Sequence, residues 1–183
     1  MPAITTVLRS DDFIVCHGFL GPNESHEIVL KGDGFFIEWL YCILTPLDNS
    51  NSVETQSGTM EFYDRFTDEL LHVSTLKSNE LMDYKPWIGA KLKQTVNDNF
   101  AYYFAFNPIP YTDKHDCYVY DYSKEGEILI EASDKIKYVI PITGDCFVNG
   151  VHIKEKQFAK IIENKPINIF KEKKSIICVF IKK

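Results

Sequence analysis

Short apolar runs separated by turn-forming residues dominate the chain between Tyr138 and Ile181. Asn149-Gly150 lies between two such runs and suits the type I′ turn of a β-hairpin, because both residues tolerate a positive φ. Pro166 lacks an N–H donor and should begin a strand rather than interrupt one. The last run, from Ser175 to Ile181, is nearly all β-branched or aromatic, as in a strand buried on both faces. The pattern predicts five strands in about 45 residues, the density of an antiparallel sandwich or barrel.

Strand-like patterns also fill the earlier part of the chain. Phe35–Thr45 is its most hydrophobic strand candidate, and Phe100–Phe106 places four aromatic side chains on one face by alternation. Leu70–Leu76 is a further strand candidate. Ser78–Tyr84 is interpreted as one short helical turn, because Ser78 can cap it. The fold class predicted is therefore all-β, with little helix.

A Pro-rich connection, residues 107–116, divides the chain near its middle. It predicts a first β half at residues 1–112 and a second at 113–183. No flexible linker separates them, so we expect the two halves to pack closely as one unit. A chain of this length can supply one good core or two small ones.

Composition supports strands, and the charge distribution bears on partners. The chain has 13 Phe, 10 Tyr and 2 Trp, a composition that favours strands over helices. Its net charge is −6, but residues 154–183 hold nine Lys against three Glu, which leaves −12 for the remainder. Lysines in turns and on edge strands protect a sheet from aggregation. Only Arg9 and Arg65 supply guanidinium groups, which argues against a nucleic-acid partner.

Cysteine usage and hydropathy indicate a cytoplasmic protein. The five cysteines are odd in number and form no C-x-x-C motif, so reduced thiols are expected. The N-terminus lacks the basic start and long apolar core of a signal peptide. The longest apolar stretch, Phe35–Leu44, contains Glu38 and is too short to cross a bilayer, so no membrane partner is expected.

The C-terminal pattern resembles the second half of a cupin jelly roll. The residues that carry this resemblance are a strand ending in Pro141-x-x-Gly144-Asp145, the Asn149-Gly150 hairpin, and a following Phe158-Ala-Lys-Ile strand. Cupins form a superfamily with many activities, so the resemblance implies a fold more than a function.

Several short matches in order resemble the HutD/Ves family of bicupins. They are Glu24–Ile28, Phe35–Trp39, Ser57–Phe62, Ala90–Leu92 and Phe104–Asn107, followed by the second cupin region. His26 stands where that family has Arg, and Ala105 where it has Asp. The resemblance implies two cupin halves in one chain and a small-molecule-binding or regulatory role in histidine utilisation.

The histidine pattern of a metal-binding cupin is missing. Such a site would combine His-x-His, a nearby Glu and a later His. Here the five histidines are isolated, and His115-Asp-Cys117 is the best local cluster. The positions where the second barrel would carry ligands hold Glu131, Ser133, Lys135 and Lys137. No G-x-S-x-G, P-loop, H-E-x-x-H or G-x-G-x-x-G motif occurs. We therefore expect no metal and no cofactor.

The preferred interpretation is a metal-independent protein that binds a small polar metabolite, with a regulatory role as one option. Aromatic walls with a few polar groups are usual in such sites. The resemblance implies Glu24, His26, Trp39 and Asn107 as contacts, and strand alternation adds Tyr120. Three carboxylates lie within apolar strands, namely Glu38, Glu61 and Glu131, and are expected to face solvent. If buried, they could act as general acids or bases.

Two other classes stay open, and no catalytic residue is assigned. One is a cupin-type isomerase or lyase acting on a sugar or small acid. It would need a metal held by His115, Cys117 and a distant carboxylate, or a Glu/His acid–base pair. The other is a non-catalytic β module that binds proteins through an exposed aromatic patch. A homodimer formed by edge strands fits all three interpretations.

Overall fold

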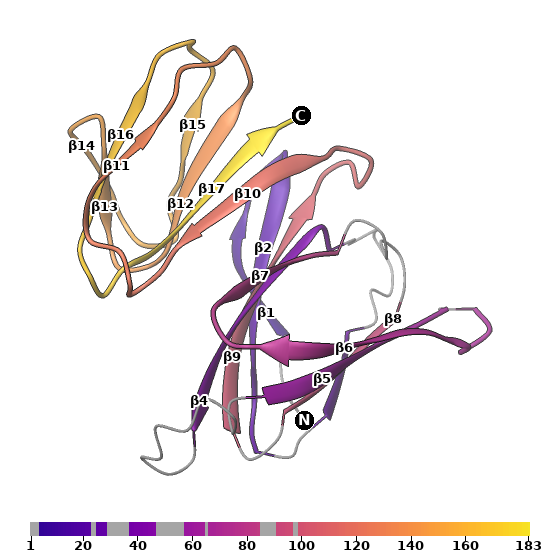
Figure 1. Cartoon of the computed structure of the whole chain (residues 1–183). Helices are drawn as coiled ribbons and strands as arrows, with labels where there is room; N and C mark the ends of the chain where they lie inside the picture. The colour runs from indigo at the N-terminus through magenta and orange to yellow at the C-terminus, as the bar shows by residue number, and fades with distance from the viewer. Residues whose placement is uncertain are drawn as a thin grey trace. The chain divides into compact units, whose positions relative to one another are not determined.

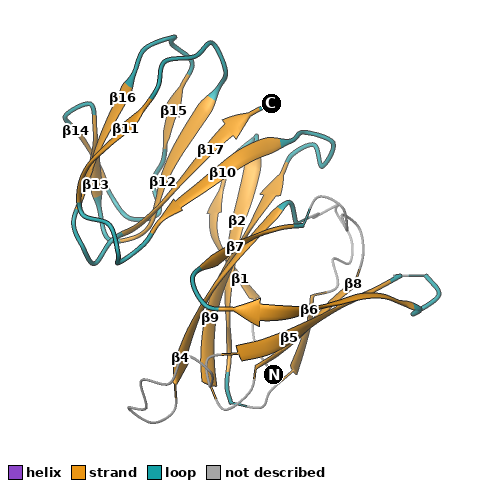
Figure 2. Cartoon of the chain, viewed as in Figure 1, coloured by secondary structure: helices purple, strands orange, loops and turns teal. Residues whose placement is uncertain are grey.

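The structure is a computed structural model that describes residues 4–22, 25–28, 37–46, 57–64, 66–84, 91–96 and 99–183. Within these ranges the chain forms seventeen strands. No helix is present among the described residues (Figure 2). The predicted all-β fold class is confirmed. None of the described residues belongs to a helix that could span a membrane. The chain divides into two compact units, Met1–Thr112 and Asp113–Lys183.

The first unit is built from two antiparallel sheets (Figure 1). Its strands are β1 (Ile4–Arg9), β2 (Phe13–Leu20), β3 (Ser25–Ile28), β4 (Trp39–Pro46), β5 (Ser57–Tyr63), β6 (Leu70–Lys77), β7 (Glu80–Asp83), β8 (Lys91–Val96) and β9 (Asn99–Pro108). One sheet has the order β1-β2-β9-β4-β7, and the other has the order β3-β8-β5-β6.

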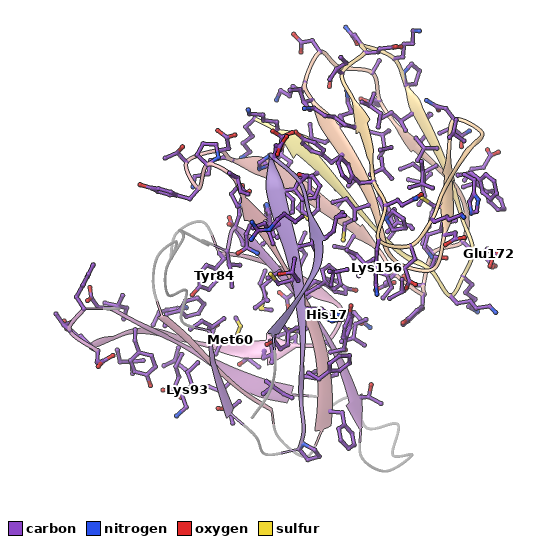
Figure 3. The ribbon with its side chains drawn as sticks, turned by 180° about the vertical axis from the view of Figure 1, so that it is seen from behind. His17, Met60, Tyr84, Lys93, Lys156 and Glu172 are labelled. Carbon is purple, nitrogen blue, oxygen red and sulfur yellow. The ribbon has the colours of Figure 1, made fainter. Side chains whose placement is uncertain are left out.

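The core of the first unit includes alternate residues of strands from both sheets. Leu40, Cys42 and Leu44 of β4 belong to it, as do Met60 of β5 and Tyr84 after β7 (Figure 3). This burial removes apolar surface from water, which is the main favourable term in folding.

Gly18 of β2 is required by the close approach of Tyr103 from β9. A Cβ atom on Gly18 would lie 2.2 Å from the Tyr103 Oη. Burial raises the pKa of the Tyr103 phenol, with smaller contributions from Cys42 and Cys16. The Tyr103 ring can therefore pack against β2 only at a residue that has no side chain.

The second unit repeats this architecture. Its strands are β10 (His115–Tyr120), β11 (Gly126–Ile130), β12 (Lys137–Thr143), β13 (Cys146–Val148), β14 (Val151–Ile153), β15 (Ala159–Ile161), β16 (Ile167–Lys171) and β17 (Ile176–Lys182). The sheets have the orders β10-β17-β12-β15 and β11-β16-β13-β14. Apolar residues of both sheets, such as Ile128, Val139, Ile169 and Val179, form its core.

Both units have the strand order of a jelly roll. In β2–β9 and again in β10–β17, one sheet contains the first, eighth, third and sixth strands, and the other contains the second, seventh, fourth and fifth. This arrangement is that of an eight-stranded double-sheet jelly roll. The predicted pair of jelly-roll halves is therefore confirmed, although no repeat is visible in the sequence itself.

The hairpin prediction at Asn149-Gly150 is confirmed by φ angles of 49° and 81°. Ile176–Phe180 of β17 are all buried, as the apolar run predicted. The region from Tyr138 to Ile181 holds six strands, β12 to β17, rather than the five predicted.

The predicted helical turn at Ser78–Tyr84 is wrong. Asn79 has a φ of 59°, and its N–H donates to the Cys42 carbonyl at 2.9 Å. The Ser78 Oγ accepts from the Leu44 N–H at 2.9 Å instead of capping a helix. This turn carries the chain from one sheet to the other, and β7 then pairs with β4.

Candidate functional site

An open groove of about 500 Å³ lies in the second unit, between β10 at the edge of one sheet and β11 at the edge of the other. It is lined by Asp116, Tyr118, Tyr120, Leu129, Ile130, Glu131, Ala132, Ser133, Lys135 and Ile181. We call it the tyrosine groove. Its volume falls in the range of pockets that bind small molecules.

Strand β10 positions the aromatic wall of the tyrosine groove. Asp116, Tyr118 and Tyr120 alternate on one face, where they pair with Ile181, Val179 and Ile177 of β17. Tyr120 packs against the core, and Tyr118 is 47% exposed. Burial, and to a lesser degree Tyr118, raises the pKa of Tyr120. Its hydroxyl is therefore neutral near pH 7 and can both donate and accept a hydrogen bond.

The opposite wall is a loop held in place by a buried lysine. The Lys137 side chain, which is 1% exposed, donates from Nζ to the Ser133 carbonyl at 2.9 Å and to the Lys135 carbonyl at 3.1 Å. Lys137 pairs with Ile181 on the face of β12 that is directed into the unit. Its ammonium thus fixes the loop that presents Glu131, Ser133 and Lys135 to the groove.

The chemistry of the tyrosine groove is mixed. Ile130 and Ile181 provide apolar surface, and Asp116 and Glu131 provide carboxylate acceptors. The Asp116 Oδ1 lies 3.5 Å from the Lys183 Nζ. Lys135 adds a cation at the rim. Such a surface can hold a small polar molecule that has an apolar face.

Asn107 lies in the first unit, at the end of β9. It is 2% exposed, and its Nδ2 donates to the Ile14 carbonyl at 3.1 Å. Its Oδ1 is buried and accepts no hydrogen bond from the described residues. A buried acceptor in this state has a substantial desolvation cost, and such groups often mark a site for a water or a ligand.

The Trp39 side chain does not lie beside Asn107. It pairs with Phe106 on β9, one position from Asn107, so the two side chains lie on opposite faces of the sheet. Tyr120 belongs to the other unit. His26 lies in β3 opposite Gln94, and its side chain is outside the described part, as is the whole of Glu24. Within the first unit, Trp39 and Asn107 therefore do not share a site on one face of the sheet.

The three carboxylates of the apolar strands differ in environment. Glu38 is 0% exposed, so the expectation that it faces solvent is wrong. Its N–H donates to the Phe106 carbonyl at 2.9 Å, so it is tied to β9 directly before the paired part of β4 begins. Glu61 is partly buried and accepts a hydrogen bond from the Tyr63 hydroxyl. Glu131 is exposed, as predicted.

The best local metal candidate of the sequence lies on the other face of β10. His115 and Cys117 are both buried and pair with Lys182 and Phe180, opposite to the face that carries Tyr118 and Tyr120. Within the described ranges, no three His, Cys, Asp or Glu side chains group as a metal ion would require.

No protein-family model and no curated protein sequence matches the chain. Solved structures do. A mutant of the Bacillus subtilis oxalate decarboxylase OxdC matches with a TM-score of 0.56 and 8% identity, over 100% of this chain and 72% of that one. The Escherichia coli pirin YhhW, solved with nickel(II), matches with a TM-score of 0.50 and 10% identity, over 92% and 80%.

HutD from Pseudomonas fluorescens also matches, with a TM-score of 0.48 and 8% identity, over 93% of this chain and 79% of that one. This score is too low to support the HutD/Ves resemblance. The identities are all low, so the matches bear on fold alone. The chain has the cupin fold.

Proposed function

We propose that this protein binds a small polar metabolite in the tyrosine groove without the help of a metal ion. The observation that carries the proposal is the pair Tyr118 and Tyr120, which face one cavity beside Asp116 and a loop fixed by Lys137. Aromatic surface with a few oriented polar groups is the usual composition of a small-molecule site.

The groove favours binding because its parts are ordered before a ligand arrives. The Tyr120 ring packs against the core, and Lys137 holds the opposite loop. Ordering of side chains and loops is one of the main costs of association, so a fixed site binds more tightly than a mobile one. The tyrosine hydroxyls and carboxylates then select a ligand with hydroxyl or amino groups.

We further propose that this protein is cytoplasmic and has a regulatory role. It would form a homodimer through edge strands and would bind neither nucleic acid nor membranes. None of the five cysteines is joined in a disulfide, which is the usual state in a reducing compartment. Catalysis is not part of the proposal.

Native mass spectrometry of the purified protein, before and after incubation with a defined mixture of amino acids and small carboxylic acids, tests this function. We expect an organic adduct on the wild type that is lost in Tyr118→Ala. Tyr122→Ala is the matched control, because Tyr122 is also 47% exposed but lies outside the groove lining. One transition metal per chain, or an adduct that persists in Tyr118→Ala, would contradict the proposal.

A further inference from the structure

The outer face of the β11-β16-β13-β14 sheet carries a row of aromatic side chains that the tyrosine groove does not use. Phe170 of β16, Phe147 of β13 and His152 of β14 are direct cross-strand neighbours. Phe170 is 48% exposed and Phe147 is 43% exposed. Half-exposed phenylalanines on adjoining strands leave aromatic surface open to a ligand.

The rings of this row are arranged as an angled platform. Phe147 stacks on His152 with a centroid distance of 5.0 Å and an interplanar angle of 23°. Phe147 and Phe170 meet edge to face at 6.5 Å and 63°. The His152 Nε2 lies 2.8 Å from the Asp145 Oδ2, which fixes the imidazole in its stacked orientation.

A polar rim encloses one side of the platform. Together they form a cavity of about 510 Å³ lined by Gly144, Asp145, Phe147, His152, Phe170, Glu172, Lys174 and Ser175. We call it the outer-face pocket. It shares no lining residue with the tyrosine groove. Glu172 projects at the outer edge of its unit (Figure 3).

The two segments of the rim are held together. The Ser175 Oγ donates to the Asp145 carbonyl at 3.1 Å. Gly144 has a φ of 70°, and a Cβ atom there would lie 2.4 Å from the Ser175 Oγ, so the segments touch where only glycine fits. The Asp145 Oδ1 accepts from the Glu155 N–H at 2.9 Å. The rim is therefore ordered without a ligand.

A buried lysine fixes the loop that carries Glu172 and Lys174. The Lys171 Nζ donates to the Glu172 and Asp121 carbonyls at 2.8 Å and to the Lys124 carbonyl at 2.5 Å. Burial lowers the pKa of this ammonium, against the opposing effect of Asp121 and Glu125. Lys171 thus fixes a loop at the outer-face pocket, as Lys137 fixes a loop at the tyrosine groove.

The charges of the outer-face pocket argue for a neutral ligand. Glu172 and Asp145 disfavour an anion, and Lys174 disfavours a cation. The backbone and His152 contacts of Asp145 hold its pKa below the usual range, so it is ionised but already engaged. The pocket thus offers both donors and acceptors beside an apolar aromatic surface.

We propose that the outer-face pocket binds a pyranose ring of a saccharide. A pyranose has C–H groups on one face, which pack on an aromatic ring, and hydroxyl groups around its edge, which both donate and accept hydrogen bonds. Phe147 and Phe170 would take the C–H face. Glu172, Lys174 and Ser175 would bind the hydroxyls at the edge.

Titration of the ¹⁵N-labelled full chain with cellobiose, maltose, lactose and chitobiose, followed by NMR, tests this proposal. We expect at least one disaccharide to shift the amide signals of residues 144–152 and 170–175. Phe170→Ala should weaken this binding about tenfold or more, which corresponds to 1.4 kcal/mol. Glu172→Ala should weaken it too, and it removes only an exposed side chain.

Phe66→Ala is the matched control, because Phe66 is an exposed phenylalanine of the other unit. It should leave the shifts unchanged. The proposal is overturned if no disaccharide shifts these signals, if only groove residues respond, or if both pocket variants bind as the wild type does. It is also overturned if tetramethylammonium produces the shifts and the sugars do not.

Discussion

Replacement of Lys171 by methionine tests whether the buried ammonium stabilises the second unit. An ammonium has three N–H donors. The three shortest contacts of the Lys171 Nζ, to the carbonyls of Asp121, Lys124 and Glu172, use all three. Methionine has a similar length and can be buried, but it donates no hydrogen bond. Lys171→Met therefore leaves three carbonyl groups around an apolar side chain.

The magnitude follows from two opposing effects. Hydrogen bonds from a charged donor contribute about 1.5–3 kcal/mol each, so three of them give a gross loss of about 4.5–9 kcal/mol. Removal of a buried charge recovers several kcal/mol of desolvation cost. We expect a net loss of about 3 kcal/mol in the free energy of unfolding, a large part of the about 5–15 kcal/mol that stabilises a typical domain.

Native-state hydrogen exchange of amides in β16 and β17 measures the free energy of unfolding of this unit. Lys173→Met is the matched control, since it is a lysine of the same loop with an exposed side chain. It should change the stability by less than about 0.5 kcal/mol. The reasoning is refuted if Lys171→Met destabilises no more than Lys173→Met.

Three further predictions concern both units. Gly18→Ala should destabilise the first unit by about 3 kcal/mol, because the new Cβ atom would overlap the Tyr103 ring. Tyr103→Leu in the same chain should partly restore the stability measured by urea unfolding. If the effects of the two substitutions are additive, this contact is not the cause. Lys137→Met should raise amide exchange at residues 133–135 about tenfold through loss of two hydrogen bonds, whereas Lys135→Met should not. The lowered pKa of Asp145 stabilises the fold above the ordinary carboxyl value of 3.8, and this contribution is lost as the pH falls through the lower, folded-state value. Asp145→Asn should therefore flatten the pH dependence of the urea midpoint between about pH 2 and pH 5, and an unchanged profile would count against the role of Asp145.

Local signals predicted the fold of the second unit well. Asn149-Gly150 specifies its turn through backbone preference alone, and the apolar run that ends at Ile181 is buried on both faces as its composition indicates. The turn at Ser78 could not be predicted, because its hydroxyl accepts from Leu44, which is distant in sequence.

The candidate site was only partly predictable. Alternation placed Tyr118 and Tyr120 on one face but could not show which face lines a cavity. Glu38 precedes a strand that is apolar on both faces, so alternation could not show whether Glu38 is buried. Lys171 was counted among the surface lysines, and Lys137 among the positions where the second barrel would carry ligands. Their burial could not be predicted, because the carbonyl groups that accept from them belong to turns whose path only the fold determines. A hydrogen bond from a buried ammonium group to a backbone carbonyl requires no particular residue type at the acceptor, so no sequence pattern predicts it.

Saturation-transfer NMR with the defined mixture of amino acids and small carboxylic acids, applied to the wild type, Tyr118→Ala and Tyr122→Ala, tests the tyrosine groove most directly. We predict that at least one compound receives saturation from the wild type and from Tyr122→Ala, and that Tyr118→Ala abolishes the transfer. If no compound binds the wild type, or if Tyr118→Ala binds the same compound equally well, the groove is not the site of metabolite binding.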